Sequence, residues 1–298
     1  VGTASPDESE NELANKMVGR AIMLKVEKEE AKPAGGGLCF DKVSLLGSAG
    51  NTILDHVSLD VERGEVVAVA GVQGNGQTEL AEAILGLVNP DSGSITLEGV
   101  DITHAGPRKS LDAGIGFIPE DRSTDGIIAG FSISENLILD QFDKAPFAAG
   151  PALRLGVIEK NAKALEEEYD IRLTSIEDPI SSLSGGNQQK VVVARELSKD
   201  LNLLVANQPT RGVDVGSIEF IHKQIVSVRD QGTPVLLISS ELDEVVALAD
   251  RIAVMYRGRI MGVVAPDTPR EVLGLMMAGV PLEEALASQS DSTQEEAR

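Results

Sequence analysis

The sequence predicts an α/β protein built around a parallel sheet. Three apolar runs of strand length carry this prediction, at residues 66–70, 203–206 and 235–239. Strands of a parallel sheet are covered on both faces, so they read as unbroken apolar runs rather than as alternating patterns. Segments with helical spacing of apolar residues separate the runs, and this alternation is typical of a parallel α/β core. The 298 residues, 42% of them hydrophobic, are enough to bury one large core.

The first predicted elements lie on either side of the first apolar run. Val57, Leu59 and Val61 alternate with polar residues, which predicts a half-buried strand. A glycine-rich turn at residues 71–76 follows the apolar run, and a helix is expected after it. The apolar residues of that helix fall at helical spacing: Leu80, Ile84, Leu87 and Val88. Turn-forming residues at 89–93 are expected to end the helix.

Two more helical patterns follow. Between the second and third apolar runs, one helix face is apolar: Ile218, Ile221, Ile225 and Val228. Gly232 is well placed to stop this helix. The segment from about 121 to 182 is expected to be an inserted helical lobe. Its helical pattern is Ile158, Ala162, Leu165 and Tyr169.

Composition divides the chain into three parts. Residues 1–35 begin with acidic residues and close with Lys32-Pro33-Ala34 at the run of three glycines, 35–37, a composition typical of a linker. Residues 36–270 are expected to form the folded domain. Residues 271–298 are expected to give a C-terminal helix and a tail whose Ser, Gln and Glu content is typical of disorder.

The charge and the hydropathy pattern exclude several classes of function. The chain has 26 basic and 47 acidic side chains, a net charge of −21, so binding to DNA or RNA is disfavoured by repulsion. No apolar run reaches the ~18 residues of a membrane span, and the first thirty residues are too polar for a secretory signal. The chain is therefore expected to stay in the cytoplasm.

Cysteine and histidine carry no predicted chemistry. Cys39 is the only cysteine, so no internal disulfide can form, and it is expected to be a small hydrophobic residue of the core. His56, His104 and His222 are expected to be surface or packing residues.

The glycine-rich turn has the skeleton of a phosphate-binding loop. Such loops aim backbone N–H groups at phosphate, while a lysine reaches the terminal phosphates and a hydroxyl holds Mg²⁺. Here the hydroxyl is present as Thr78, but Gln77 stands in the lysine position. The candidate nucleotide-binding residues are Gly71, Gly74, Asn75, Gly76, Gln77 and Thr78. The alternative is a glycine-rich turn that only packs.

A second candidate anion site lies about a hundred residues later, in Leu183-Ser-Gly-Gly-Asn-Gln-Gln-Lys190. Ser184, Gly185 and Gly186 precede a helical pattern, so backbone amides and a hydroxyl would face an anion at the positive end of a helix dipole. The alternative, a simple Ser-Gly-Gly loop, does not account for an eight-residue motif in this order after a phosphate-binding loop.

These two motifs together resemble the ATP-binding cassette family over residues 38–268. The resemblance implies a nucleoside-triphosphatase core with a parallel sheet, an antiparallel β subdomain and an inserted helical subdomain. It also implies that ATP and Mg²⁺ are the ligands. In this family the eight-residue motif, called the signature, contacts the γ-phosphate of an ATP held by a partner domain.

Several positions depart from the family pattern. In 203–210 the metal-binding aspartate is replaced by Asn207 and the glutamate that acts as base by Gln208. The switch histidine falls at Ser240, and the glutamine that contacts Mg²⁺ and water falls at Glu120. The aromatic residue that stacks on adenine aligns near Gly47. Neutral amides neither complement Mg²⁺ nor accept a proton from water as a carboxylate does, so Thr78 and Asn207 are expected to form a weak metal site.

Three motifs are typical of the second cassette of sugar and nucleoside importers: Pro119-Glu-Asp-Arg122, the signature, and Pro209-Thr-Arg-Gly-Val-Asp-Val-Gly216. The sequence Asn-Gln-Pro-Thr at 207–210 looks more like that of nucleoside importers that use a basic-membrane-lipoprotein type of binding protein. By this resemblance Ser184, Gly186, Gln188 and the dimer-facing Asp214 would serve the site of a first cassette in the same polypeptide, to which residues 14–20 would connect. The other implied partners are transmembrane permease subunits and, indirectly, an extracytoplasmic substrate-binding protein, at the cytoplasmic face of the membrane. Two alternatives are a regulatory module that pairs with cassettes and a soluble cassette ATPase.

Overall fold

The computed structural model describes Val26 and residues 28–288. The folded part divides into two compact units. The helical unit contains residues 118–200 and 209–225, and the sheet unit contains residues 28–117, 201–208 and 226–288. The linker expected at 1–35 and the tail expected at the C-terminus lie largely outside the described residues.

A six-stranded sheet, in the order β12-β11-β3-β10-β9-β6, forms the centre of the sheet unit. Its strands are β3 (Val66–Ala70), β6 (Ile115–Ile118), β9 (Leu203–Asn207), β10 (Val235–Ser239), β11 (Arg251–Tyr256) and β12 (Arg259–Val264). β11, β3, β10 and β9 run parallel, and β12 pairs antiparallel with β11. Every residue of β3, β9 and β10 is buried, which confirms the three strands predicted from apolar runs.

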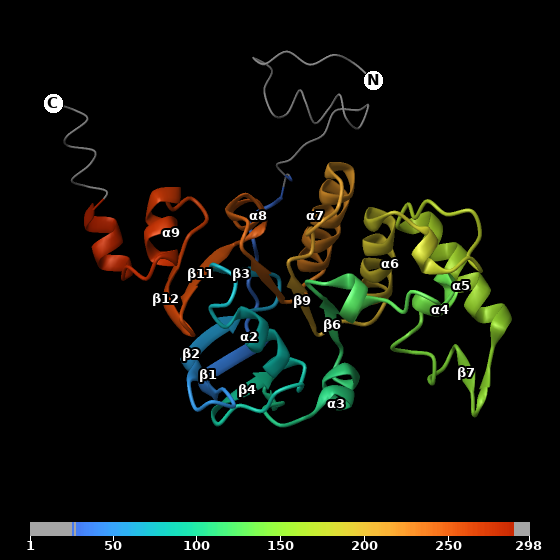
Figure 1. The fold of residues 1–298 in the computed structure, drawn as a ribbon, viewed down its shortest axis with the longest axis horizontal. Helices are drawn as coiled ribbons and strands as arrows, with labels where there is room; N and C mark the ends of the chain where they lie inside the picture. The colour runs from blue at the N-terminus through green and yellow to red at the C-terminus, as the bar shows by residue number, and fades with distance from the viewer. Residues whose placement is uncertain (1–25, 27, 289–298) are drawn as a thin grey trace, which may run out of the picture. The chain divides into compact units, whose positions relative to one another are not determined.

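An antiparallel sheet in the order β2-β1-β4-β5 is the second layer of the sheet unit (Figure 1). Its strands are β1 (Leu38–Leu46), β2 (Thr52–Val61), β4 (Ser92–Leu97) and β5 (Val100–Asp101). One core cluster joins side chains of both sheets with those of helix α2 (Gln77–Ile84). The predicted parallel core with an antiparallel β subdomain is therefore confirmed.

Cys39 does not belong to this core, so that prediction is wrong. The side chains of Leu38 and Phe40 are buried, whereas Cys39 between them is exposed. Successive side chains of a strand point to opposite faces. Because Leu38 and Phe40 face the core, Cys39 faces solvent.

The helix after the glycine-rich turn ends earlier than predicted. α2 ends at Ile84, and Gly86 adopts φ +69°, a left-handed conformation that suits glycine. A Cβ on Gly86 would lie 2.7 Å from the backbone of Gly106. Leu80 and Ile84 are buried as expected, but Leu87 lies beyond the helix and is exposed.

The remaining helices of the sheet unit are short. They are α3 (Pro107–Asp112), α8 (Leu242–Leu248), α9 (Arg270–Met277) and a last helical stretch over residues 282–288. α9 packs on β11 and buries Val272, Leu273 and Met276. It corresponds to the C-terminal helix expected after residue 270.

The helical unit contains α4 (Ile133–Asn136), α5 (Leu155–Glu168) and α6 (Gly185–Leu197), drawn in green to yellow in Figure 1. It also has a hairpin of β7 (Ala148–Ala149) and β8 (Ala152–Leu153), a π-helical turn η1 (Arg122–Gly126) and a 3₁₀ turn η2 (Ile180–Ser182). The predicted apolar face of α5 is buried: Ile158, Ala162, Leu165 and, just after the helix, Tyr169.

The helix predicted around residues 218–228 is α7 (Val215–Asp230). Ile221, Ile225 and Val228 are buried on one face, and the chain leaves the helix at Gly232 with φ +92°. Among the described helices, none combines the length and the apolar character that crossing a membrane requires.

Candidate functional site

The glycine-rich loop lies between β3 and α2, at the carboxyl end of a central strand of the parallel sheet. Ligand sites of open α/β sheets are found at this edge. Gly74 has φ +88° and Gly76 has φ +106°, conformations that a residue with a Cβ rarely adopts. Gly76 caps α2 without a side chain, which leaves the helix N-terminus to backbone N–H groups. Thr78, in the first turn of the helix, is exposed.

Gln77 folds back into this loop instead of reaching outward. Its Oε1 accepts a hydrogen bond from the backbone N–H of Asn75 at 3.1 Å, and its Nε2 donates to the carbonyl of Val72 at 3.1 Å. The side chain is buried, and a Cβ on Gly71 would lie 2.4 Å from its Nε2. The carboxamide therefore takes up part of the hydrogen bonding that a phosphate-binding loop offers to its ligand.

Asn75 fixes the other side of the loop. Its Nδ2 also donates to Val72, at 2.9 Å, and its Oδ1 accepts the backbone N–H of Arg257 at 2.8 Å. Its carbonyl accepts the N–H of Gly258 at 2.8 Å. The loop is thus tied to the turn between β11 and β12.

The ends of β9 and β10 bring three predicted site residues to the same edge of the sheet. Asn207, the last residue of β9, is buried. Gln208 adopts φ +49°, and its Nε2 donates to Oγ of Ser240 at 3.1 Å. The predicted base position and the predicted switch position therefore contact each other.

Neither side chain of this pair, nor Asn207, carries charge. Mg²⁺ in phosphate-transfer sites is bound by carboxylates together with phosphate oxygens. The described residues include no cluster of three His, Cys, Asp or Glu side chains that could hold a metal ion. Thr78 and Asn207 do not supply the ligand set that Mg²⁺ prefers.

The signature begins helix α6 in the helical unit. Ser184 is the N-cap, and its Oγ accepts hydrogen bonds from the backbone N–H and the Nδ2 of Asn187, at 3.4 and 3.2 Å. Nε2 of Gln188 donates to the carbonyls of Ile180 and Leu183. The exposed start of a thirteen-residue helix is therefore held in place by its own side chains.

Gly186 packs against the start of α7. A Cβ here would lie 2.4 Å from Oδ2 of Asp214 and 2.5 Å from Oγ of Ser217. The Asp214 carboxylate accepts both the backbone N–H and the hydroxyl of Ser217, at 3.0 and 2.8 Å. Burial acts to raise the pKa of Asp214, but the hydrogen bonds from Ser217 and backbone groups outweigh it and hold the pKa below its ordinary value. Asp214 is therefore ionised beside the signature.

Glu120 also lies in the helical unit, where it forms an ion pair with Arg211. Arg122, two residues later, donates from Nη1 to the carbonyl of Arg211 at 3.1 Å and from Nη2 to that of Gly212 at 3.4 Å. Its Nη2 would lie 2.4 Å from a Cβ on Gly185. The sequence reasoning gave Arg122 no role, although it belongs to the motif Pro119-Glu-Asp-Arg122.

The position expected to hold an adenine-stacking residue lies in a tight turn. The backbone N–H of Gly47 donates to the carbonyl of Asn51 at 2.7 Å, and a Cβ on Gly47 would lie 2.6 Å from the Asn51 side chain. A larger residue at position 47 would have to displace the Asn51 side chain.

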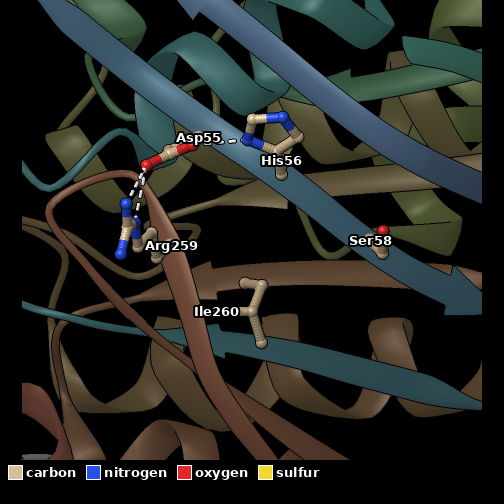
Figure 2. Close-up of a pocket in the computed structure, with 5 residues that line it drawn as sticks. All are labelled: Asp55, His56, Ser58, Arg259 and Ile260. Carbon is tan, nitrogen blue, oxygen red and sulfur yellow. Dashed lines mark hydrogen bonds and ion pairs between the residues drawn. The ribbon is translucent and has the colours of Figure 1, made fainter.

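A separate surface pocket of about 390 Å³ lies between β2 and β12 (Figure 2). Its lining residues are Asp55, His56, Ser58, Arg259 and Ile260. Asp55 accepts hydrogen bonds from Nδ1 of His56 and Nε of Arg259, both at 2.6 Å. These bonds hold the pKa of Asp55 below its ordinary value, and the bond from His56 has the larger effect. The pocket contains none of the predicted site residues.

His56 and His104 are exposed and His222 is buried, as expected of surface and packing residues.

Comparison with known proteins gives one consistent group. The sequence profile of the ABC transporter family matches residues 54–211. The chain is 45% identical over 280 residues to a guanosine import ATP-binding protein, NupO of Bacillus subtilis, covering 94% of this chain and 55% of that protein. It is 44% identical to a nucleoside import ATP-binding protein, NupA of Lactococcus lactis, covering 92% and 54%.

The chain spans about half the length of these curated relatives. Among solved structures, a nucleotide-free ATP-binding cassette from an ABC transporter aligns with a TM-score of 0.66 at 24% identity, covering 78% of this chain and 92% of that one. This likeness confirms the predicted fold.

Proposed function

The chain belongs to the ABC transporter family, and on that premise we propose that it is the second ATP-binding cassette of an importer for nucleosides or simple sugars. The relatives named above are import proteins for guanosine and for nucleosides, and a further relative, 44% identical, is a glucose import protein of Haloferax volcanii. In this proposal a first cassette of the same polypeptide hydrolyses ATP, and the present chain completes that site with its signature.

The observation that carries the proposal is the contrast between this chain's own phosphate-binding loop and its signature. At the edge of the sheet, Gln77 closes its own loop and Gln208 pairs with Ser240. A lysine charge ~4 Å from a phosphate contributes on the order of 4 kcal/mol of Coulomb energy at an intermediate dielectric, before desolvation is subtracted. Loss of a general base typically removes ~10²- to 10⁴-fold of rate. The chain's own loop is therefore a degenerate site that binds Mg-ATP weakly.

The signature keeps the features that an anion-binding site needs. Ser184, which is exposed, caps a long helix that begins with two glycines, so the positive end of the helix dipole lies at this surface. An oxyanion developing on a γ-phosphate is stabilised by preorganised donors of this kind. The ionised Asp214 belongs to the segment that would face the partner cassette.

The remaining partners follow from the importer assignment. We expect permease subunits at the cytoplasmic face of the membrane, with a substrate-binding protein acting through them. Five of the eleven large apolar side chains exposed in the described residues lie in the helical unit, which supports a protein contact there: Ile128, Phe131, Phe142, Leu153 and Leu155. The net charge of −21 opposes nucleic acid as a partner and with it a soluble cassette ATPase acting on DNA or RNA.

One observation favours a second candidate, a regulatory module that pairs with a cassette without productive contact to ATP. Gln77 takes up one backbone N–H and one carbonyl of its own loop, so part of the loop's hydrogen bonding is satisfied by the chain itself. The signature separates the two candidates, because only the first requires its donors.

The experiment is a comparison of substitutions in the two-cassette protein. Ser184→Arg should abolish transport-coupled ATPase activity, because a bulky side chain would cover the amides at the start of α6. Ser198→Arg places the same change on the exposed serine at the other end of α6 and should keep activity. Gln208→Ala should have a much smaller effect than Ser184→Arg. If Ser184→Arg were fully active while Gln208→Ala or Thr78→Ala was inactive, the productive site would lie on this chain's own loop.

A further inference from the structure

The guanidinium of Arg122 joins two segments that the proposed function uses separately. One is the start of α6, where Nη2 of Arg122 lies against Gly185. The other is the segment 211–214, whose first two carbonyls accept hydrogen bonds from Nη1 and Nη2. A guanidinium suits this task because its planar donors fix two acceptors in one geometry.

The turn that carries Arg122 is itself anchored on α6. Asp121 caps the turn η1 by accepting the backbone N–H groups of Ser123 and Thr124, at 2.9 and 3.3 Å. At the other end of η1, the carbonyl of Gly126 accepts a hydrogen bond from Nη1 of Arg195, a buried residue of α6, at 2.8 Å. The start of the turn is therefore ordered by its own cap, and its end at Gly126 is fixed on the signature helix.

A third contact acts on the same segment. Glu120 holds the side chain of Arg211 in an ion pair, while Arg122 holds its carbonyl. Gly212 follows with φ +67°, a conformation that favours glycine at the point where the guanidinium binds. Residues 120 and 122 thus hold the segment 211–214 from one side.

We propose that Arg122 is a positioning residue that keeps the signature and the segment 211–214 in one fixed arrangement. This inference rests on the proposed function, in which both meet the partner cassette when it binds ATP. Loss of Arg122 leaves the donors of the signature intact but allows them to shift relative to the segment beside them. Misplacement of catalytic groups by about 1 Å can cost about 10²-fold in rate.

The test uses the two-cassette protein and measures kcat and KM for ATP. Arg122→Ala should lower kcat by about tenfold or more with little change in KM, because ATP is held by the other cassette. Arg122→Lys keeps the charge but not the two-acceptor geometry, and it should resemble Arg122→Ala. Arg154→Ala removes another guanidinium of the helical unit that donates to a carbonyl, and it should keep activity. Normal kcat in Arg122→Ala, or normal activity in Arg122→Lys, would overturn the positioning role.

A second measurement is independent of ATP hydrolysis. Gly185→Ala should destabilise the protein because its Cβ meets Arg122, and the same substitution should cost less in an Arg122→Ala background, where the next contact is an ordinary 3.4 Å. Additive effects of the two substitutions on stability would contradict the packing on which the proposal stands. If this coupling is found but Ser184→Arg remains active, the proposed function fails, and the role of Arg122 in hydrolysis fails with it. If Ser184→Arg is inactive and Arg122→Ala is not impaired, only the role of Arg122 fails.

Discussion

Gln77 occupies its own loop, with its Oε1 3.1 Å from the backbone nitrogen of Asn75. A residue at this position was expected only to lack the charge of a lysine. The observed contact adds a second effect, because the side chain competes with phosphate for a backbone donor. The missing charge alone predicts no change in ATP binding when the side chain is removed, whereas the competition predicts tighter binding.

We expect Gln77→Ala to bind Mg-ATP more tightly than the wild-type chain, by about fivefold, because a backbone hydrogen bond worth about 1 kcal/mol no longer opposes the ligand. Gln77→Lys should bind more tightly still, since it also restores a positive charge. Isothermal calorimetry measures both. Gln231→Ala removes an exposed glutamine elsewhere in the sheet unit and should have no effect. Weaker binding by Gln77→Ala than by the wild type would show that the side chain assists the ligand.

The isolated chain should hydrolyse ATP at a rate close to background. Gln77, Asn207, Gln208 and Ser240 replace the lysine, metal ligand, base and sensor, and the last two are hydrogen-bonded to each other. For the same reason Gln208→Glu alone should not restore activity. A steady-state phosphate-release assay checks this, and turnover on the order of 1 per second or more by a pure preparation contradicts it.

The parts of the fold that follow from local pattern could be predicted from the sequence. The run 66–70 is buried on both faces and became β3 without a change of boundary. Cys39 was misassigned because an apolar residue type was given more weight than its alternation with Leu38 and Phe40. The end of α2 had a local signal that was not used, because Gly86 follows this helix with a positive φ just as Gly232 follows α7. The close approach of Gly86 to Gly106, twenty residues later, is a tertiary contact that no local pattern reveals.

The candidate site was likewise predicted only in part from the sequence. Motif spacing located the loop, the signature and the positions 207, 208 and 240. It did not reveal that Gln77 turns inward or that Arg122 contacts Gly185, sixty-three residues later in the chain. These contacts are set by tertiary packing, which residue types alone do not determine.

A charge cluster around the buried Arg229 in the sheet unit gives a stability prediction. Asp250 accepts Nζ of Lys28 at 2.8 Å, Nη1 of Arg229 at 3.0 Å and the backbone N–H of Val66 at 2.8 Å. Arg229 is 1% exposed, and burial is the main reason that the pKa of Lys28 is lowered. Asp250→Asn leaves the buried Arg229 and the half-buried Lys28 with less compensation and should cost about 3 kcal/mol of unfolding free energy.

The matched control for Asp250→Asn is Asp243→Asn, which removes the carboxylate of an exposed ion pair with Arg270. Exposed pairs contribute about 0–1 kcal/mol, so this variant should unfold close to the wild type in a denaturant titration. Equal effects of the two substitutions would show that burial of the cluster does not determine its contribution.

Tyr169 gives a prediction for alkaline pH. Its ring is buried and meets Phe220 edge to face at 6.2 Å. Burial, followed by the charge of Glu168, raises the pKa of Tyr169 from 10.0 to about 12. Because the folded state holds this proton more tightly than the unfolded state, the resulting stabilisation is complete below about pH 10 and is lost as the pH rises towards about 12.

The chain has two tyrosines and no tryptophan, so Tyr256→Phe leaves Tyr169 as the single tyrosine whose ionisation is seen by ultraviolet absorbance. In the folded variant the titration midpoint should lie near pH 12, and in denaturant it should fall to about 10. If alkaline unfolding comes first, the absorbance change should coincide with the loss of helical circular dichroism, and Tyr169→Phe should move that unfolding to higher pH. A folded-state midpoint near pH 10 would show that the hydroxyl is solvated, and the predicted alkaline loss of stability would then be absent.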